Sequence, residues 1–328
     1  MSGSATARQS STAGVVGQTT LRVELKEPIA DGVCRLRLVD PHGERLADWS
    51  AGAHIDLGLA NGMTRQYSLC GDRWDPYGYE IAVLYEPNGK GGSRFIHDCL
   101  AVGDLVEVGG PRNHFRLVPA MRYLFIAGGI GITPIVPMVE HAEKLETPWT
   151  LLYGGRRMES MAYLDRLREW GERVVLRPQD SYGHLDIADA VDAVTEGMKI
   201  YCCGPPPLLE AVERACVGLP TGILRVERFV ANTQRPPVRS ATYQVELARS
   251  GTTLTLSPEQ SVLDALVNAG VPILASCRHG LCGTCETKVI AGVPDHRDSI
   301  LDDAERALCD RFYPCVSRSA SDRLVVDL

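Results

Sequence analysis

The chain lacks three features that would place it in other classes of protein. It has no apolar run of the roughly 20 residues that a membrane-spanning helix needs. It has no basic excess, because its formal net charge is -7 over 328 residues, and this argues against nucleic-acid binding. Its start, MSGSATARQSSTAGVVGQTT, lacks the apolar core of a secretory signal. We therefore expect a cytoplasmic protein that binds neither membranes nor nucleic acid.

The eleven cysteines need an explanation in such a protein. In a reducing compartment they should be free thiols rather than a disulfide framework, so clusters among them indicate metal binding. A hydrophobic share of 45% is sufficient to fill the cores of two or three domains.

The pattern along the chain predicts three domains. Short alternating apolar segments such as TLRVELKE and YEIAVLYE predict an antiparallel β-barrel. Apolar runs that alternate with helical stretches, such as RYLFIAG and KIYCCG, predict a parallel α/β domain. The aperiodic segment VANTQRPPVRSA predicts a linker. The expected limits are 1–19 for a mobile tail, 20–118 for the barrel, 119–230 for the α/β domain, 231–241 for the linker and 242–328 for the third domain.

Capping signals predict where two helices begin. Thr133 followed by Pro134 predicts the start of a helix after a glycine-rich turn. In the third domain, Ser257 and Gln260 form a capping-box pattern around an N1 proline, ahead of an amphipathic helix that ends near Gly270.

Three cysteines in the third domain have the spacing C-x4-C-x2-C: Cys277, Cys282 and Cys285. This spacing is typical of a plant-type 2Fe-2S cluster, in which one loop supplies three thiolates and a distant element supplies the fourth. Zinc sites usually draw their ligands from two short pairs. Gly280 and Gly283 allow the backbone to curl so that its N–H groups approach the sulfur atoms.

Two cysteines are candidates for the fourth ligand. Cys309 falls near the end of a predicted helix that Asp302 and Asp303 open, whereas Cys315 follows Pro314 in an irregular stretch. A loop position turns its sulfur toward a cluster more freely, which favours Cys315.

A strand, a glycine-rich turn and a helix make up the run YLFIAGGIGITPIVPMVEHA. Such a turn lets the backbone approach a pyrophosphate at the positive end of a helix. The strand ends LLYGGRR and YCCGPPPLL should converge on the same crevice. No acidic residue ends the second strand, whereas Arg156 and Arg157 follow it, so the chemistry leaves NADH and NADPH both open.

The segment MTRQYSLCG, at the end of a barrel strand, has the residues for a flavin site. Tyr67 suits an isoalloxazine ring, Ser68 a hydrogen bond near its N5, and Arg65 a phosphate. The turn from Lys90 to Ser93 suits a terminal phosphate. A flavin is also required by the chemistry, since a nicotinamide gives up two electrons as a hydride while a cluster accepts one at a time.

Taken together, these segments resemble the phthalate dioxygenase reductase family. The resemblance covers the chain after its tail and is carried, in family order, by RQYSL, IAV with GKGGS, AGGIGITP, YCCGP, VERF, CRHGLCGTC, DHRD and CVSRS. It implies a multidomain α/β plus β fold: an antiparallel flavin-binding β-barrel, a parallel α/β NAD-binding domain and a C-terminal β-grasp 2Fe-2S ferredoxin domain.

The resemblance also implies site residues. The cofactor of the barrel would be FMN, bound by Arg65, Gln66, Tyr67, Ser68, Ala82, Val83, Leu84, Lys90, Gly91, Gly92, Ser93, Thr133 and Phe229. The NADH site would consist of Gly129, Gly131, Pro134, Gly155, Arg156, Cys203, Gly204 and Pro205. The cluster ligands would be Cys277, Cys282, Cys285 and Cys315, with Cys309 a spectator. Leu84 stands where relatives can carry a basic residue, which keeps FAD as an alternative.

The function expected from this resemblance is an NADH-dependent reductase component of an oxygenase system. Electrons would pass from NADH to FMN, to the 2Fe-2S cluster and to a terminal oxygenase, either Rieske-type or a cytochrome P450. Ser68 and Cys203 would tune and position the hydride step. The resemblance implies a monomer. Residues 242–328 contain 12 Asp and Glu against 8 Lys and Arg, which suits docking on a basic partner patch.

Three alternatives remain open at this point. One is a ferric or flavin reductase that acts on small acceptors with NADH or NADPH. Another is a ferredoxin-like protein that only carries electrons. The third is a zinc-dependent binding or regulatory protein.

Overall fold

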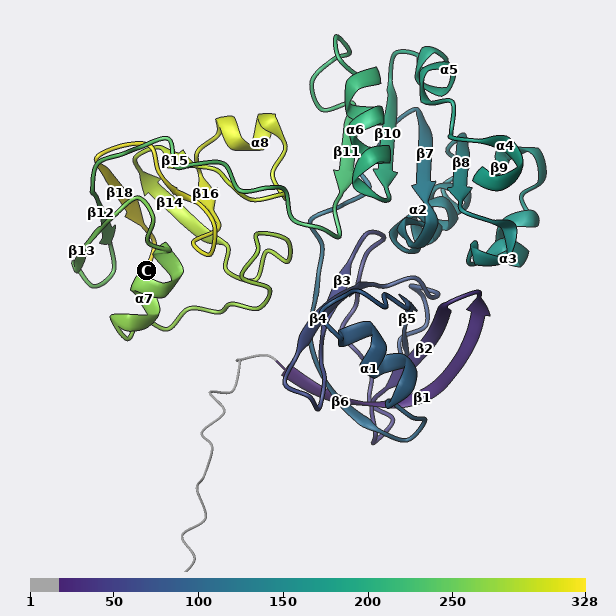
Figure 1. The fold of residues 1–328 in the computed structure, drawn as a ribbon, viewed down its shortest axis with the longest axis horizontal. Helices are drawn as coiled ribbons and strands as arrows, with labels where there is room; N and C mark the ends of the chain where they lie inside the picture. Colours follow the sequence, from purple (N-terminus) through teal and green to yellow (C-terminus); the bar gives the residue numbers. More distant parts are fainter. Residues whose placement is uncertain (1–17) are drawn as a thin grey trace, which may run out of the picture.

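The computed structural model describes residues 18–328, which form three domains (Figure 1). The expected mobile tail lies outside the described residues, except for Gln18 and Thr19. These two residues were wrongly placed in the tail, because they begin the first strand and pair with Gly109 and Val108. No helix within the described range combines the length and the apolar character that crossing a membrane requires.

The first domain is an antiparallel sheet that curls into a barrel. Its strand order is β4-β3-β6-β1-β2-β5, and a bridge between Leu69 and Ile81 joins the two ends of the sheet. Alternate residues such as Leu36 and Leu38 fill its core, as a period of two requires. The elements are β1 (Gln18–Ala30), β2 (Val33–Val39), β3 (His54–Gly58), β4 (Thr64–Ser68), β5 (Tyr79–Leu84), α1 (Gly92–Asp98) and β6 (Leu105–Arg112).

The second domain is a five-stranded parallel sheet of order β11-β10-β7-β8-β9. Helices cover both of its faces, so β7 is buried on each side. Phe125 packs with α2 in one core, and Ile126 packs in the other. Its strands are β7 (Arg122–Gly128), β8 (Trp149–Gly155), β9 (Val174–Pro178), β10 (Met198–Cys203) and β11 (Leu224–Glu227). Its helices are η1 (Gly129–Gly131), α2 (Ile132–Lys144), η2 (Met158–Ser160), α3 (Leu164–Arg168), η3 (Gly171–Arg173), α4 (Gln179–Tyr182), α5 (Ile187–Asp192) and α6 (Pro206–Ala215).

The third domain is a mixed sheet of order β13-β12-β18-β14-β16, with a separate pair, β15-β17. Strand β12 pairs with β18 in parallel, and α7 covers the sheet through Val262 and Leu266. The elements are β12 (Tyr243–Leu247), β13 (Thr253–Leu256), α7 (Val262–Asn268), β14 (Thr287–Ala291), β15 (Pro294–Asp295), α8 (Asp303–Ala307), β16 (Arg311–Phe312), β17 (Arg318–Ser319) and β18 (Arg323–Val326).

Both predicted helix caps were wrong by a few residues. Helix α2 begins at Ile132 with Gly131 as its N-cap, since the turn η1 runs directly into it, and Thr133 lies inside the helix. Helix α7 is capped by Ser261, whose hydroxyl accepts a hydrogen bond from Asp264 N. The residues around Ser257 stay out of the helix, because the buried Arg318 guanidinium binds the carbonyl groups of Pro258 and Glu259.

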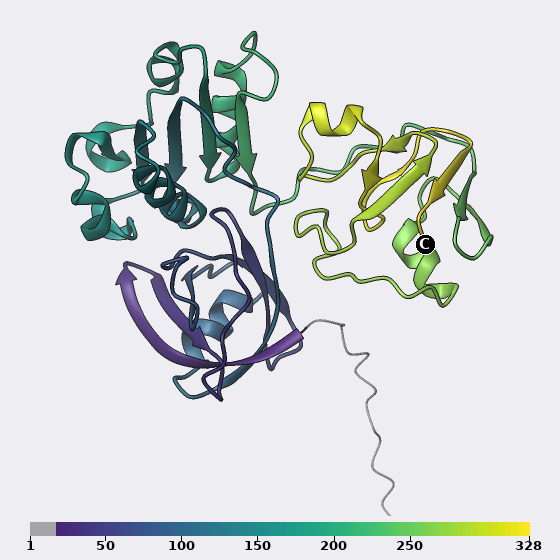
Figure 2. The same cartoon turned by 180° about the vertical axis from the view of Figure 1, so that it is seen from behind.

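The domains meet around the barrel. Residues between β11 and β12 form an extended connection without a helix or strand, and Figures 1 and 2 both show a light-green loop of the third domain that points toward the barrel. This loop lies between α7 and β14 and contains the three clustered cysteines.

Candidate active site

The carboxyl ends of three parallel strands form the predicted coenzyme site. Cys203 at the end of β10 is in register with Ala127 on β7, and Gly128 is in register with Gly154 on β8. The backbones meet closely here: a Cβ on Gly204 would lie 3.1 Å from the Cα of Gly128. A side chain on Gly204 would also come within 2.8 Å of Leu208, so glycine permits this approach and brings the turns after β7 and β10 to the same edge of the sheet.

The structure brings most of the predicted NADH residues to this edge. They are Gly129 and Gly131 in η1, Pro134 in the first turn of α2, and Cys203, Gly204 and Pro205 between β10 and α6. Of the remaining two, Gly155 ends the neighbouring strand β8 and Arg156 follows it.

The two arginines after β8 differ in their surroundings. The guanidinium of Arg157 forms an ion pair with Asp31 of the barrel, at 3.2 Å. The side chain of Arg156 is exposed and has no hydrogen bond or ion pair with other residues in the range that the structure describes. Arg156 is therefore the arginine whose side chain can bind a coenzyme.

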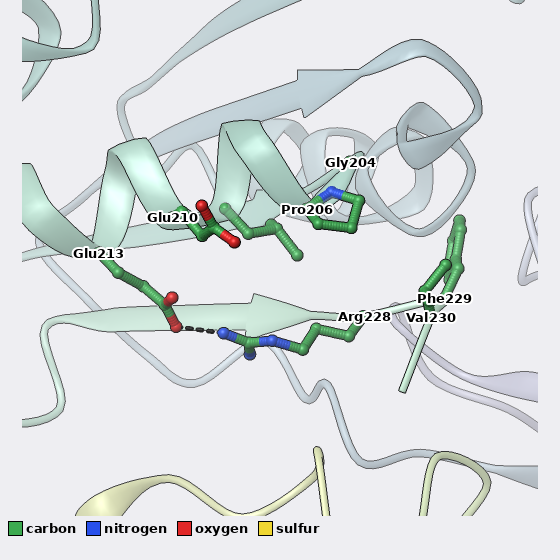
Figure 3. Close-up of a pocket in the computed structure, with 8 residues that line it drawn as sticks. Gly204, Pro206, Glu210, Glu213, Arg228, Phe229 and Val230 are labelled. Atoms are coloured by element: carbon green, nitrogen blue, oxygen red, sulfur yellow. Dashed lines mark hydrogen bonds and ion pairs between the residues drawn. The ribbon is translucent and has the colours of Figure 1, made fainter. Parts of the chain in front are cut away.

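A pocket opens between the start of α6 and the end of β11 (Figure 3). Arg228 and Glu213 form an ion pair along one side of it, and the ring of Phe229 stands at its other end. Phe229 is 41% exposed, an unusual degree for a phenylalanine. The exposed ring lies next to the coenzyme edge through Gly204, and it is available to cover a planar ligand.

The predicted flavin residues come from the two strands that close the barrel and from α1. Arg65, Gln66, Tyr67 and Ser68 belong to β4, and Ala82, Val83 and Leu84 end β5. The Arg65 guanidinium lies over Gly92, where a Cβ would come within 2.7 Å of its Nε. The turn Lys90 to Ser93 thus presents a cation, glycine backbone and a hydroxyl together, which fits a phosphate.

The hydroxyl groups of two predicted flavin residues already form hydrogen bonds within the protein. Thr133 is buried, and its hydroxyl donates a hydrogen bond to the carbonyl of Ile130 at 3.0 Å. Ser93 Oγ accepts a hydrogen bond from Glu86 N. Both side chains stabilise the local turns that hold the backbone in place.

Sequence reasoning missed Glu227, which joins the two sites. It ends β11 in register with Cys203, and its buried Oε2 has no hydrogen-bond partner among the described residues. Burial raises the pKa of the Glu227 carboxyl to about 8, although the nearby Ser68 hydroxyl opposes the shift. The Glu227 charge in turn adds to burial in raising the pKa of Cys203. Ser68, Glu227 and Cys203 therefore form one connected group between barrel and coenzyme edge.

The four predicted cluster ligands come together as two pairs of thiols. Hydrogen bonding from Cys282 lowers the pKa of Cys277 to about 6, whereas hydrogen bonding with Cys285, together with burial, raises the pKa of Cys315. No three or more His, Cys, Asp or Glu side chains within residues 18–328 are grouped as a set that could hold a metal ion. Two pairs match the requirement of a two-iron cluster, in which each iron takes two thiolates.

Backbone geometry around the thiols supports this fit. Gly280 and Gly283 have φ values of 70° and 69°, which glycine adopts without strain. The turn directs the N–H of His279 to Cys277 Sγ at 3.3 Å and the N–H of Cys277 to Cys282 Sγ at 3.5 Å. Cys309 is apart from this group, and its thiol donates to the carbonyl of Arg306.

Sequence reasoning also missed two histidines of the barrel that contact the cysteine loop. His54 Nε2 donates to the carbonyl of Cys282 at 3.3 Å, and the His114 ring lies against Gly283. Burial lowers the pKa of His54 to about 4, so its imidazole is neutral. No motif marks these residues in the sequence, because the contact exists only after two domains have packed.

Comparisons with known proteins agree with this site. Residues 125–214 match the oxidoreductase NAD-binding domain, and residues 245–320 match the 2Fe-2S iron-sulfur cluster binding domain. The chain is 45% identical over 320 residues to the phenoxybenzoate dioxygenase subunit beta of Ectopseudomonas oleovorans, covering 97% of this chain and 100% of that protein.

Two solved structures share the fold. Phthalate dioxygenase reductase, a modular structure for electron transfer from pyridine nucleotides to [2Fe-2S], superposes with a TM-score of 0.68 at 34% identity, over 95% of this chain and 98% of that chain. An intact type IV self-sufficient cytochrome P450 monooxygenase superposes with a TM-score of 0.90 at 40% identity, over 95% of this chain. This chain spans 41% of that longer protein.

The barrel, the coenzyme edge and the cysteine loop thus define a three-domain oxidoreductase with a flavin fold, an NAD-binding domain and a 2Fe-2S domain. Within this class, the chain belongs to the phthalate dioxygenase reductase family, whose members are reductase components of oxygenase systems. The predicted fold class and family are confirmed, and the structural match implies FMN as the flavin.

Proposed function

We propose that this protein passes electrons from NADH through FMN and a 2Fe-2S cluster to a separate terminal oxygenase. The observation that carries the proposal is the position of strand β4. Its last residue, Ser68, faces Glu227 at the coenzyme edge, while Gln66 on the same strand donates to Ser276 Oγ, next to the cysteine loop, at 3.2 Å. One strand of the barrel therefore contacts both the coenzyme edge, where electrons would enter, and the cysteine loop, from which they would leave.

Most of the NADH-binding residues contribute through backbone position rather than through side-chain chemistry. Gly129, Gly131 and Gly204 present backbone, Pro134 and Pro205 fix the starts of α2 and α6, and Gly155 makes room for Met161. Arg156 supplies a positive charge for the coenzyme. Preference for NADH over NADPH rests on the family, since no carboxylate follows β8 directly.

Ser68 and Cys203 position the reacting groups rather than act as nucleophiles. Both are buried, and burial raises the pKa of the Cys203 thiol so that it stays protonated. Glu227 holds a proton on its carboxyl at neutral pH, because its pKa is raised to about 8. The three side chains keep the coenzyme edge and the barrel in a fixed relation and exclude water between them.

The flavin residues of β4, β5 and α1 would hold FMN, for which Arg65 and the turn from Lys90 to Ser93 supply phosphate-binding groups and Phe229 supplies an exposed aromatic ring. Cys277, Cys282, Cys285 and Cys315 hold the cluster. When bound, the flavin accepts two electrons together and releases them singly, which is the conversion that a one-electron cluster needs.

The partner is a terminal oxygenase, either Rieske-type or a cytochrome P450, since the relatives include a dioxygenase subunit and a cytochrome P450 monooxygenase. We infer a cytoplasmic monomer with domain limits 18–118, 119–230 and 242–328, in which the first limit now includes the start of β1. The acidic excess of residues 242–328 suits a basic patch on the oxygenase.

Acceptor assays test the route of the electrons. The purified holoprotein is mixed with NADH and either cytochrome c or a ferric chelate, and compared with a Cys315→Ser variant. The proposal expects NADH-dependent reduction of cytochrome c that depends on Cys315. Equal reduction of both acceptors by the variant would instead indicate a reductase that serves small acceptors directly from the flavin.

A further inference from the structure

We propose that His54 and His114 of the barrel are positioning residues. They hold one part of the cysteine loop, residues 281–285, against the barrel for electron transfer. The inference rests on the proposed function, because it concerns the step between the flavin domain and the cluster. Neither histidine belongs to the predicted cofactor or ligand sets.

His54 binds the loop through its backbone. It opens β3, where it is in register with Ser68 on β4 and Arg112 on β6, so strands on both sides fix its position. Its ring is 6% exposed, and Nε2 donates to the carbonyl of Cys282, a proposed iron ligand, at 3.3 Å. Among the described residues this is the one side-chain hydrogen bond of His54, and a buried donor that loses its acceptor is costly, so the contact favours the packed position of the loop.

His114 fixes the next residue of the loop by close packing. It follows β6, and a Cβ on Gly283 would lie 1.9 Å from its Nε2. Its ring stands edge-on to Tyr313, with centroids 6.3 Å apart, and 6.0 Å from the ring of His54. Tyr313 packs in turn with Cys285 and Cys315 in one buried cluster. The two imidazoles therefore contact adjacent residues of the loop, and His114 also contacts a tyrosine that packs against the other cysteine pair.

Further polar contacts flank the histidines. Gln66 donates to Ser276 at 3.2 Å, and the Lys90 ammonium donates to the His279 ring at 3.3 Å. The extended connection between β11 and β12 is hydrogen-bonded to the third domain, for example from Asn232 N to Ser299 Oγ at 3.0 Å, and Arg225 of β11 forms an ion pair with Asp302 at 3.8 Å. The contacts from the barrel are the ones that reach the cysteine loop itself, so we expect them to set how close this loop comes to the barrel. The histidines act by position, one through a hydrogen bond and the other through close packing.

The first test compares three variants of the holoprotein. His54→Leu keeps the apolar volume but removes the donor, His54→Gln offers an amide N–H near the place of Nε2, and His42→Leu is a control on an exposed barrel histidine. Anaerobic stopped-flow mixing with NADH follows flavin bleaching and cluster reduction separately. A second readout is the rate of backbone amide hydrogen exchange in residues 276–286 without NADH, which reports how firmly the loop packs against the barrel.

For His54→Leu we expect flavin bleaching within twofold of the parent protein, cluster reduction slowed by about tenfold or more, and faster exchange of the loop, because small misplacements of reacting groups have large effects on rate. His54→Gln should restore both the rate and the protection. Cluster reduction and exchange unchanged in His54→Leu would overturn the inference, as would a failure of His54→Gln to differ from His54→Leu in properly folded, cofactor-loaded protein.

A second variant tests the loop side in case His54→Leu fails to fold. Gly283→Ala places a methyl group against His114. Gly270 has a similar φ of 73° but lies in open space, so Gly270→Ala is the matched control for backbone strain alone. Slower cluster reduction in Gly283→Ala alone supports the inference, and equal rates in the two variants contradict it. If the parent protein showed no flavin bleaching by NADH, the proposed function itself would fail, which is a distinct result.

Discussion

The carbonyl oxygen of Cys203 faces Gly131 so closely that a Cβ on Gly131 would lie 2.3 Å from it. The turn after β7 and the end of β10 are thereby locked together through bare backbone. This contact explains why the glycine-rich motif and the YCCGP motif, more than 70 residues apart in the sequence, form one binding edge.

Replacing Gly131 by alanine should therefore disrupt coenzyme binding selectively. The methyl group would push η1 away from β10, and we expect the rate of flavin reduction at low NADH to fall by about a hundredfold, since displacement of a binding loop by about 1 Å is known to have effects of this size. Stopped-flow absorbance measures the rate, and dithionite should still reduce flavin and cluster. Gly131 has a φ of -62°, so an alanine there meets a clash rather than backbone strain. Gly171→Ala, at a φ of 58° in open space, is the control for replacing a turn glycine without a clash. Equal NADH rates in the two variants would contradict the assignment.

Glu227 should make stability depend on pH. Because the folded-state pKa is raised from 4.5 to about 8, the folded protein binds this proton more tightly than the unfolded chain does. The resulting stabilisation is complete below about pH 4.5 and is lost as pH rises to about 8. Glu227→Gln should remove this decline in thermal melts across that range, whereas Glu196→Gln at an exposed site should not. A parent protein whose melting temperature rose steadily over this range, with no difference in Glu227→Gln, would refute the assignment.

Cys315 and Cys309 provide a matched pair of substitutions. Cys315→Ser should prevent assembly of the normal cluster and stop electron transfer to acceptors beyond it, while NADH still reduces the flavin. Cys309→Ser should retain full iron and acid-labile sulfide, because the Cys309 thiol donates its hydrogen bond to the Arg306 carbonyl rather than to another thiol. Iron and sulfide analysis with visible spectra measures both. Loss of the cluster in Cys309→Ser instead would show that the ligand assignment is wrong.

Arg65 should contribute to flavin affinity. Its guanidinium lies over Gly92 at the proposed phosphate site, and a charge-assisted hydrogen bond contributes about 1.5–3 kcal/mol. Arg65→Ala should weaken FMN binding by about tenfold or more, measured by fluorescence titration of flavin-free protein. Arg94→Ala is the control, because Arg94 lies in α1, the helix that contains Gly92, and its side chain donates to the Pro87 carbonyl. An unchanged FMN affinity in Arg65→Ala would place the phosphate elsewhere.

The sequence allowed much of the fold to be predicted, because strand alternation and glycine-rich turns are local signals. The cysteine spacing likewise predicted one shared site for the three loop cysteines, which lie within nine residues, whereas their grouping with Cys315 into two pairs is visible only in the structure. The caps at Thr133 and Ser257 failed where tertiary contacts override local preference: η1 leads into α2, and Arg318 holds the turn before α7. Glu227, His54 and His114 could not be identified, because their roles arise from burial between strands or domains that are distant in sequence.

The most direct test of the electron route is an anaerobic titration of the purified holoprotein with NADH, monitored by visible absorbance and EPR. We predict bleaching of the flavin together with the rhombic EPR signal of a reduced 2Fe-2S cluster, and iron and acid-labile sulfide in equal amounts. Flavin bleaching without that signal, or a protein that contains zinc and no sulfide, would contradict the account.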